Sequence, residues 1–254
     1  MTSDAKAILC DAFLGGKLNI WQPVSCYRAG IDPVMLAASV QAEPGQELLD
    51  LGCGVGVAAL CTARRVDGLR ITGLELQTSY ADLARRNGQE NGINFEVLEG
   101  DLARLPAPLK NRQFHHVIAN PPYFDRDHSK PAERADREIA LGEKTALSAW
   151  IKVAAQRARP KGYVTFILRT ERLVEFLTHA KNYLGSLEVL PLKPYVGEDP
   201  RLLIVKGRRA GRAAFRLLDG WVLHERQINE TRAKNYTNAT NLVLREGMGL
   251  DKFS

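Results

Sequence analysis

The segment Phe114–Phe124 holds the residues whose types and spacing best suit a chemical reaction. It begins as an apolar strand and ends in Asn120-Pro121-Pro122-Tyr123. Proline lacks an N–H and has φ fixed near about −65°, so the two prolines end the strand at Asn120. We therefore expect the Asn120 amide, the Pro121 carbonyl and the Tyr123 ring on a rigid corner at the carboxyl end of a strand, where open α/β sheets bind ligands.

This corner suits the activation of a planar amino group. The exocyclic amine of a base is a poor nucleophile because its lone pair is delocalised into the ring. Two acceptors, the Asn120 side-chain oxygen and the Pro121 carbonyl, can hold its two N–H groups and favour a more pyramidal nitrogen. The Tyr123 ring offers a surface on which a base can stack. The alternative reading of the tetrapeptide alone is a proline-rich turn after a strand.

A glycine-rich turn precedes this corner in the chain. Strand residues 47–51 lead into Gly52, Gly54 and Gly56, and a helix follows over 57–65. Glycines permit positive φ and a close backbone approach to a ligand. The G-x-G-x-G spacing differs from the dinucleotide fingerprint, and no P-loop lysine follows it. Asp50, just before the turn, disfavours phosphate and favours a cationic amino group or hydroxyls.

Two further strands end in acids. Glu75 follows a strand over 70–74, and a carboxylate there can bind both ribose hydroxyls. Asp101 follows a strand over 95–98 and could accept from an adenine amino group. With Asp50 and Asn120, four strands each deliver a polar residue at the carboxyl end. Helical connections between them predict a parallel sheet that brings these residues to one edge.

The remaining chain continues the alternation and predicts an α/β fold, mostly parallel, with helices on both faces. A short strand over 18–23 and a helix N-capped by Asp32 and running to 41 precede the core. Helices are expected over 78–91, 147–158 and 171–184, and strands over 163–168, 187–190 and 201–206. The sequence Gly207–Gly211 predicts a turn into residues 214–218, which adds an antiparallel hairpin strand. Residues 124–144 are expected to form a loop beside the site.

Composition excludes several classes of protein. The 254 residues are 45% hydrophobic, enough for one large domain, but no run of 18 apolar residues predicts a membrane span. Residues 1–10 lack the apolar stretch of a signal peptide. The four cysteines show no C-x-x-C spacing, so we expect no metal site and a cytoplasmic protein with reduced thiols.

Charge is concentrated at the carboxyl end. The net charge is +6, and residues 201–254 hold eleven lysine and arginine residues against five acidic ones, which gives +6 for this segment alone. A basic third beside a neutral body suggests a polyanion partner, with Arg208, Arg209 and Arg212 as candidate contacts. A solvated basic surface is the alternative.

Together these motifs resemble the class I S-adenosylmethionine-dependent methyltransferases of the Asn-Pro-Pro-Tyr, N-methylating type, which have a Rossmann-like sheet. The resemblance rests on residues 49–56, Glu75, Asp101 and Asn120–Tyr123, and covers roughly residues 18–206. Gly30-Ile31-Asp32 is similar to an N-terminal Gly-x-Asp motif of the bacterial tRNA1(Val) adenine-37 N6-methyltransferases. That subgroup has a lysine near the position of Arg28, and arginine keeps the charge with different hydrogen-bond geometry.

The resemblance implies one methyltransferase domain over 1–254, with a cap over the cofactor (1–45), a core (46–206) and a basic C-terminal strand and tail (207–254). It implies that S-adenosylmethionine binds between the glycine turn, the three acids and the cap. It also implies that RNA, and specifically tRNA, is the partner, and that no metal is needed. The implied cofactor contacts are Arg28, Gly30, Asp32, Asp50, Gly52, Gly54, Gly56, Glu75, Leu76, Asp101, Leu102 and Asn120. The implied catalytic residues are Asn120, Pro121, Pro122 and Tyr123, and the implied substrate contacts are Tyr123, Phe124, Arg126, Arg208, Arg209 and Arg212.

Other functions remain open at this point. Release-factor glutamine methyltransferases use the same tetrapeptide, but they carry a helical domain before the cofactor turn, and only 48 residues precede Leu49 here. A ribosomal RNA guanine N2-methyltransferase is a second alternative. A cofactor-binding RNA-binding module without catalysis is a third, against which the intact Asn120–Tyr123 corner argues.

Overall fold

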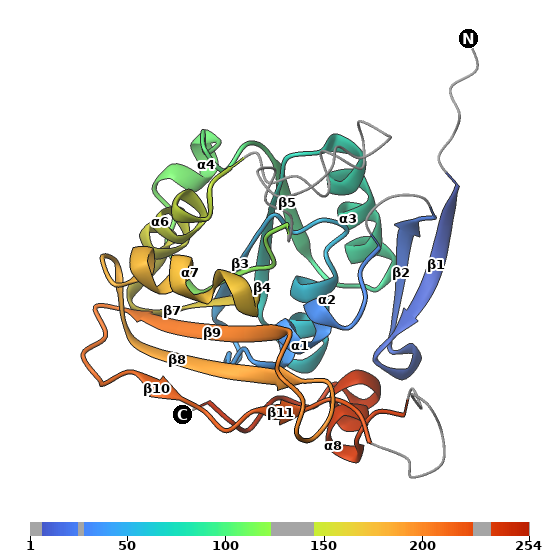
Figure 1. Ribbon diagram of the computed structural model, residues 1–254. Coiled ribbons are helices and arrows are strands. Elements are labelled where there is room, and N and C mark those ends of the chain that lie inside the picture. The colour runs from blue at the N-terminus through green and yellow to red at the C-terminus, as the bar shows by residue number, and fades with distance from the viewer. Residues whose placement is uncertain (1–6, 25–27, 123–144, 226–234, 254) are drawn as a thin grey trace, which may run out of the picture.

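The computed structural model describes residues 7–24, 28–122, 145–225 and 235–253. One long twisted sheet forms its centre, helices pack on both faces, and a separate two-stranded hairpin lies beside α3 (Figure 1). The prediction of a mostly parallel α/β sheet with an antiparallel strand is confirmed.

Figure 1 labels the elements along the chain. The strands are β1 (Ile8–Phe13), β2 (Leu18–Pro23), β3 (Glu47–Leu51), β4 (Arg70–Glu75), β5 (Phe95–Glu99), β6 (Phe114–Ala119), β7 (Ala158–Arg169), β8 (Leu184–Lys193), β9 (Leu202–Arg209), β10 (Arg216–Leu217) and β11 (Trp221–Val222). The helices are α1 (Asp32–Ala38), α2 (Val57–Arg65), α3 (Thr78–Glu90), α4 (Ala107–Lys110), α6 (Leu147–Arg157), α7 (Leu173–Ala180) and α8 (Asn238–Asn241).

The sheet has the order β10-β8-β9-β7-β6-β3-β4-β5, and β11 also pairs with β8. β3 lies between β4 and β6 and is parallel to both. Its residues are almost wholly buried, because helices cover both faces of a parallel sheet and leave no solvent side. In this register Leu51 pairs with Leu74 on one side and with Ala119 on the other.

Two hydrophobic cores cover the faces of the sheet. The first contains the buried sides of α1, α2 and α3. The second contains α6, α7 and the buried leucine of α4. Each connection between neighbouring parallel strands therefore passes over one face or the other, and the carboxyl ends of the strands stay clear at one edge.

The predicted antiparallel pairing of residues 214–218 with residues 201–206 is wrong. The antiparallel strand is β9, which lies between β7 and β8, and β10 pairs with β8 in parallel. Gly207 does not turn the chain, because it lies inside β9. A Cβ there would lie 2.8 Å from a Leu187 methyl group, so this glycine permits close packing inside the strand. The chain turns later, at Ala210, whose φ is 58°.

Several predicted boundaries also differ. α1 begins at Asp32 with Ile31 as its N-cap and ends at Ala38, so Asp32 is not the cap. β7 begins at Ala158 and not at the predicted residue 163, because Ala158 already pairs with Phe114 before a bulge. Pairing with β6 resumes at Tyr163. The predicted helix over 171–184 reduces to α7, and the residues from 184 onward pair with β9 as β8 instead.

The carboxyl-terminal residues return to the amino-terminal part of the chain, and Figure 1 shows the red segment beside the blue α1. The Leu250 N–H donates to the Ala38 carbonyl at 2.8 Å, and the Gln41 amide donates to the Phe253 carbonyl at 2.6 Å. The same Gln41 side chain accepts from the buried Lys206 ammonium at 2.6 Å. Burial lowers the pKa of Lys206 to about 8, against a rise caused by the nearby Glu188 carboxylate.

Asn87 connects three elements through its buried side chain. Its amide oxygen accepts from the Trp21 N–H in β2 at 2.8 Å. Its amide nitrogen donates to the Trp21 carbonyl at 3.1 Å and to the Val55 carbonyl at 2.9 Å. Arg86 also lies 3.9 Å from the Trp21 ring centre. The hairpin, α3 and the glycine-rich turn are thus held together by one fully buried amide.

We expect Asn87→Ala to lower the free energy of unfolding by roughly 2 to 4 kcal/mol, because it leaves buried backbone groups of Trp21 and Val55 without partners. Urea unfolding would measure the change. The control is Gln89→Ala, an exposed position on the same helix, which should change stability by less than about 0.5 kcal/mol. Equal effects of the two substitutions would contradict the role given to Asn87.

Candidate functional site

The strand register brings three of the predicted residues into one row. Leu51 pairs with Leu74 on one neighbouring strand and with Ala119 on the other. The next residue of each strand therefore lies beside the next residue of its neighbour, and these three residues are Gly52, Glu75 and Asn120. A hydrogen bond from the Gly54 N–H to the Glu75 carboxylate, 2.9 Å long, closes the row between β3 and β4. The edge predicted from the four polar strand ends therefore exists.

The glycine-rich turn has the conformation that its sequence predicts. Gly52, Gly54 and Gly56 have φ of 66°, 55° and 90°. A Cβ on Gly52 would lie 2.5 Å from the Trp150 ring, and one on Gly56 would lie 2.6 Å from the Phe95 ring. Gly54 differs, because nothing lies within 4 Å of a Cβ built there. The outer two glycines accommodate packing, whereas Gly54 borders open space.

Trp150 is a site residue that sequence reasoning missed. It belongs to α6 and is 8% exposed, and its ring supports Gly52 from the second core. Its indole nitrogen is buried and has no hydrogen-bond partner in the described residues. The apolar pattern of α6 predicts a buried face but does not distinguish this tryptophan from other core positions.

Asp50 is buried to 2% exposure inside the first core. Desolvation raises its pKa to about 8, the Ala59 N–H offsets part of this rise, and the negative charge of Glu75 adds a smaller rise. Its Oδ2 atom has no hydrogen-bond partner in the described part of the chain. An orphaned buried carboxylate oxygen beside an open glycine turn is the feature expected where a cationic or hydrogen-bonding group of a ligand completes the site.

Glu75 is also buried, at 7% exposure, but its carboxylate is held on both oxygens. One oxygen accepts from the Gln77 N–H and the other from the Gly54 N–H, each at 2.9 Å. Burial raises its pKa, and these backbone N–H groups limit the rise. The two bonds fix the carboxylate at the mouth of the turn, as bidentate binding of two neighbouring hydroxyls requires.

The third acid is placed differently. Asp101 is exposed, and its side chain accepts from the Ala103 N–H at 2.8 Å. Leu102 packs its side chain into the second core. Leu76 follows Glu75 and is 50% exposed, an apolar surface next to a buried acid. Leu76 and Asp101 thus offer an apolar face and a carboxylate beyond the ends of β4 and β5.

The corner after β6 lies at the same edge. Asn120 is half-buried, Pro121 is buried and Pro122 is half-buried. Predicted residues Tyr123, Phe124 and Arg126, and the predicted loop over 124–144, lie outside the described residues. Within the described residues, the corner therefore contributes the Asn120 amide and the Pro121 carbonyl to this edge of the sheet.

The amino-terminal cap residues are anchored to the hairpin. Arg28 pairs with Asp11 through both its Nε and its terminal nitrogen, and this contact lowers the pKa of Asp11. Gln22 donates to the same carboxylate and accepts from the Ala29 N–H at 2.8 Å. The guanidinium of Arg28 thus positions the segment before Gly30 and Asp32, and Asp11 and Gln22 are partners that the sequence did not reveal.

The basic residues predicted to contact substrate lie elsewhere. β9 is antiparallel to β7, so Arg208 and Arg209 stand at the end of β9 opposite to the edge that carries Asn120. Their guanidinium groups donate to the carbonyls of Lys161 and Ala158. Arg212 follows two residues after the turn at Ala210 and is exposed. The structure does not bring these three arginines to the corner.

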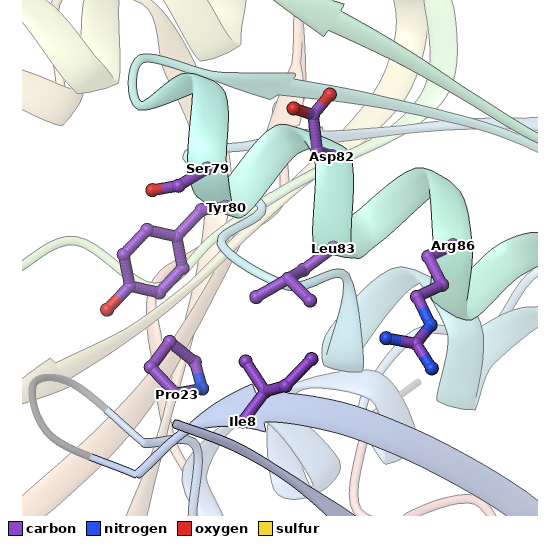
Figure 2. Close-up of a pocket in the computed structure, with 7 residues that line it drawn as sticks. All are labelled: Ile8, Pro23, Ser79, Tyr80, Asp82, Leu83 and Arg86. Atoms are coloured by element: carbon purple, nitrogen blue, oxygen red, sulfur yellow. The ribbon is translucent and has the colours of Figure 1, made fainter. Parts of the chain in front are cut away.

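A cavity of about 350 Å³ lies between the hairpin and α3. In Figure 2, Tyr80 and Leu83 of α3 face Ile8 and Pro23 of the hairpin across it, with Arg86 at one side. None of the predicted cofactor residues lines this cavity. It belongs to the contact between the hairpin and α3, not to the row of strand ends.

The site suits an organic cofactor with a nucleoside part and a charged amino-acid part. The open Gly54 turn and the orphaned Asp50 oxygen suit the amino-acid part, and the fixed Glu75 carboxylate suits ribose hydroxyls. Within the described ranges, no three His, Cys, Asp or Glu side chains gather as metal ligands. In the same ranges, no helix combines the length and apolarity needed to cross a membrane.

Comparison with protein families gives a match to the methyltransferase small domain over residues 29–170, more than half of the chain. The chain is 27% identical over 226 residues to a protein of Porphyromonas gingivalis named tRNA1(Val) (adenine(37)-N6)-methyltransferase, covering 84% of this chain and 88% of that protein. A protein of the same name from Glaesserella parasuis is 29% identical over 182 residues, covering 70% and 75%.

Solved structures share the fold. A predicted O-methyltransferase from Agrobacterium tumefaciens has a TM-score of 0.68 at 24% identity, with 86% of this chain and 97% of that chain covered. The Thermus thermophilus 16S rRNA N2 G1207 methyltransferase, solved with AdoMet and guanosine, has a TM-score of 0.59 at 18% identity, covering 80% and 50%. At these identities the likeness concerns the fold.

Gly54→Ala should separate ligand binding from stability. Both Gly54 and Gly45 have positive φ and open space around a Cβ, so alanine at either should cost about 1–2 kcal/mol of stability. Only Gly54 borders the site, and we expect Gly54→Ala alone to weaken S-adenosylmethionine binding at least about tenfold in calorimetry. Equal affinities of the Gly54→Ala and Gly45→Ala proteins would contradict the placement of the cofactor at this turn.

Asp50 should make stability depend on pH. Its folded pKa of about 8 lies above the unfolded value, so the protonated folded form is favoured and its contribution is lost as pH rises from about 4 through about 8. Relative to Asp50→Asn, the wild-type free energy of unfolding should fall over this window by at most about 1.4 kcal/mol per pH unit. Urea unfolding at several pH values measures it, and parallel pH curves for the two proteins would refute the assignment.

Proposed function

The chain belongs to the methyltransferase small domain family, and from this premise we propose that it methylates the exocyclic N6 amine of an adenine in tRNA, with position 37 of tRNA1(Val) as the target. It is an S-adenosylmethionine-dependent methyltransferase. The observation that carries the proposal is the row Gly52, Glu75 and Asn120, because it sets an amine-holding corner directly beside the cofactor turn.

The cofactor-side residues bind and orient. S-adenosylmethionine, when bound, supplies a methyl group on a positively charged sulfur. Glu75 holds the ribose hydroxyls through a carboxylate that Gly54 and Gln77 already fix. The Asp50 carboxyl binds the amino-acid end, and this contact supplies the hydrogen bond that its Oδ2 atom lacks within the described residues. Leu76 covers one face of the adenine, and Asp101 accepts from its amino group.

The acceptor-side residues position the amine. The Asn120 side-chain oxygen and the Pro121 carbonyl accept the two N–H hydrogens, which turns the nitrogen lone pair toward the methyl carbon. Catalysis then comes mainly from positioning and preorganised hydrogen bonds, and the proton can leave the amine after transfer. The target base has to leave its stack to reach this corner. Tyr123, Phe124 and Arg126 are proposed to contact that base and its strand.

Support for tRNA comes from the names of the relatives and from charge. The two relatives named above carry the tRNA1(Val) adenine-37 name and align over most of this chain. The net charge of +6, all of it in residues 201–254, suits a polyanionic substrate. A protein glutamine and a ribosomal RNA guanine also present planar amino groups, so they are the alternatives that an assay has to separate.

The experiment is methyl transfer from labelled S-adenosylmethionine to bacterial tRNA, ribosomal RNA and release factor in parallel. We expect label in one tRNA, recovered as N6-methyladenosine. Label in release factor or as N2-methylguanosine in ribosomal RNA would refute the proposed substrate and leave the methyltransferase assignment intact.

We expect Asn120→Ala to lower kcat about 100-fold or more, because it removes an acceptor that is oriented toward the reacting amine. Binding of S-adenosylmethionine should weaken much less, since Glu75 and the glycine turn remain. Asn111→Ala is the matched control, an exposed asparagine near the opposite end of β6, and it should leave kcat unchanged. A variant at Asn120 with full kcat would refute the role of the corner.

A further inference from the structure

Three aromatic rings from separate parts of the chain form one stack. The ring centres of Tyr195 and His224 are 5.4 Å apart, with planes 35° from parallel. Those of His224 and Tyr236 are 4.7 Å apart, with planes 22° from parallel. All three residues are partly buried, so the stack lies at the surface and not in the core. None of these residues has a role in the cofactor site or in the Asn120 corner.

Backbone hydrogen bonds hold the three segments in register. The His224 N–H donates to the Pro194 carbonyl at 2.9 Å, directly before Tyr195. His224 also forms a bridge with Tyr236, flanked by a 2.9 Å bond from the Thr237 N–H to the Leu223 carbonyl. The rings therefore stand on three neighbouring extended segments, which is a fixed arrangement and not a chance encounter of long side chains.

The base of the stack is rigid. The Thr237 hydroxyl donates to the Val222 carbonyl at 3.1 Å and accepts from the Thr240 N–H as the N-cap of α8. The buried Trp221 indole donates to the Thr240 hydroxyl at 2.9 Å. The Nδ1 atom of His224 is buried and has no partner in the described residues, so stacking and not a bond at Nδ1 orients that ring.

The stack lies at the edge of the sheet that carries the reaction. β8 is parallel to β7 and β6, because β9 is antiparallel to both β7 and β8. Tyr195 comes two residues after the end of β8, and Asn120 comes directly after β6. The registers of β7 and β9 put Asn120 level with Leu190 of β8, so Tyr195 comes five residues beyond that level. The two residues are therefore three strand spacings, roughly 14 Å, apart across the sheet, and up to roughly 16 Å apart along the strands. Arg208 and Arg209 lie at the opposite end of β9.

The charges near the stack favour a base over a phosphate. Within six residues of the three rings the sequence has five basic and five acidic residues, namely Lys193, Arg201, Arg226, Arg232 and Lys234 against Glu198, Asp199, Asp219, Glu225 and Glu230. This near-neutral setting gives little attraction for the backbone of a nucleic acid, whereas any base can lie on an aromatic face.

We propose that the Tyr195–His224–Tyr236 stack is the platform on which an unpaired base of the RNA substrate, a few nucleotides from the target adenine, stacks. The inference rests on the proposed function, since it needs a single-stranded RNA region at the corner. Turning the target base out of its stack opens the surrounding loop and leaves a base of that loop without a stacking partner. An aromatic platform at the same sheet edge supplies that partner, which lowers the cost of presenting the adenine to Asn120.

The test is steady-state methyl transfer to tRNA with Tyr195→Ala, Tyr195→Phe and Tyr236→Ala. We expect each alanine variant to raise KM for tRNA about tenfold, with KM for S-adenosylmethionine unchanged, and Tyr195→Phe to keep the wild-type value because it keeps the ring. The dependence of KM on salt should keep its slope, since no phosphate contact is lost. Tyr183→Ala is the control, because Tyr183 is 40% exposed and lies before β8, at the other end.

The outcomes separate this inference from the proposed function. Wild-type protein that methylates tRNA, with an unchanged KM in the alanine variants, would overturn the platform and leave the proposed function standing. So would an equal rise in both KM values, which indicates a general structural role. A wild-type protein that methylates no RNA would overturn both.

A second measurement needs no variant and covers the case in which the alanine proteins fail to fold. Wild-type protein is irradiated with unmodified tRNA in the presence of S-adenosylhomocysteine, and the crosslinked peptides are identified. Crosslinks at Tyr195, His224 or Tyr236 support the platform. Crosslinks confined to other peptides, including that of Tyr183, overturn it.

Discussion

The position of β3 between two parallel partners is the constraint on which the site depends. A slip of one residue against either neighbour would turn every side chain of that strand to the other face. It would also move the glycine turn away from Glu75 on one side and from Asn120 on the other. The two hydrophobic cores prevent such a slip, because Leu49 and Leu51 belong to one and Leu48 to the other. Chemistry at this edge is thus fixed by packing in the centre of the sheet.

The same packing makes negative charge unfavourable at this edge of the sheet when no ligand is bound. Burial raises the pKa of both Asp50 and Glu75, so ionising either carboxyl group costs free energy. Two backbone N–H groups offset this cost for Glu75, whereas one oxygen of Asp50 has no hydrogen-bond partner among the described residues. A cationic ligand group relieves this imbalance, so part of the binding energy comes from the removal of an existing penalty and not from a new contact alone.

Much of the site follows from local sequence signals. These signals act through backbone conformation and strand direction, which depend little on the rest of the fold. They are the prolines after Asn120, the glycines at 52, 54 and 56, and the acids at the strand ends. Long-range packing supplied what could not be predicted. Gly207 reads as a turn residue, yet its neighbours Leu184 and Leu187 require a bare backbone inside a strand. The functions of Trp150 and Gln22 depend on which residue they meet across the fold. The arginines at 208, 209 and 212 are close together in the sequence, but only the antiparallel direction of β9 shows at which edge of the sheet Arg208 and Arg209 lie.

The return of the carboxyl terminus to α1 has a consequence for how the chain is made. Ala38 and Gln41 bond to Leu250 and Phe253, more than 200 residues later, so these contacts cannot form until residues 250–253 have been synthesised. At synthesis rates of about 5–20 residues per second, α1 waits roughly ten seconds or more for its last partners. The glycine turn and the strands beside it can assemble in that interval. The position of α1, which follows Gly30, is then secured later than the sheet edge and depends on the synthesis of residues 250–253.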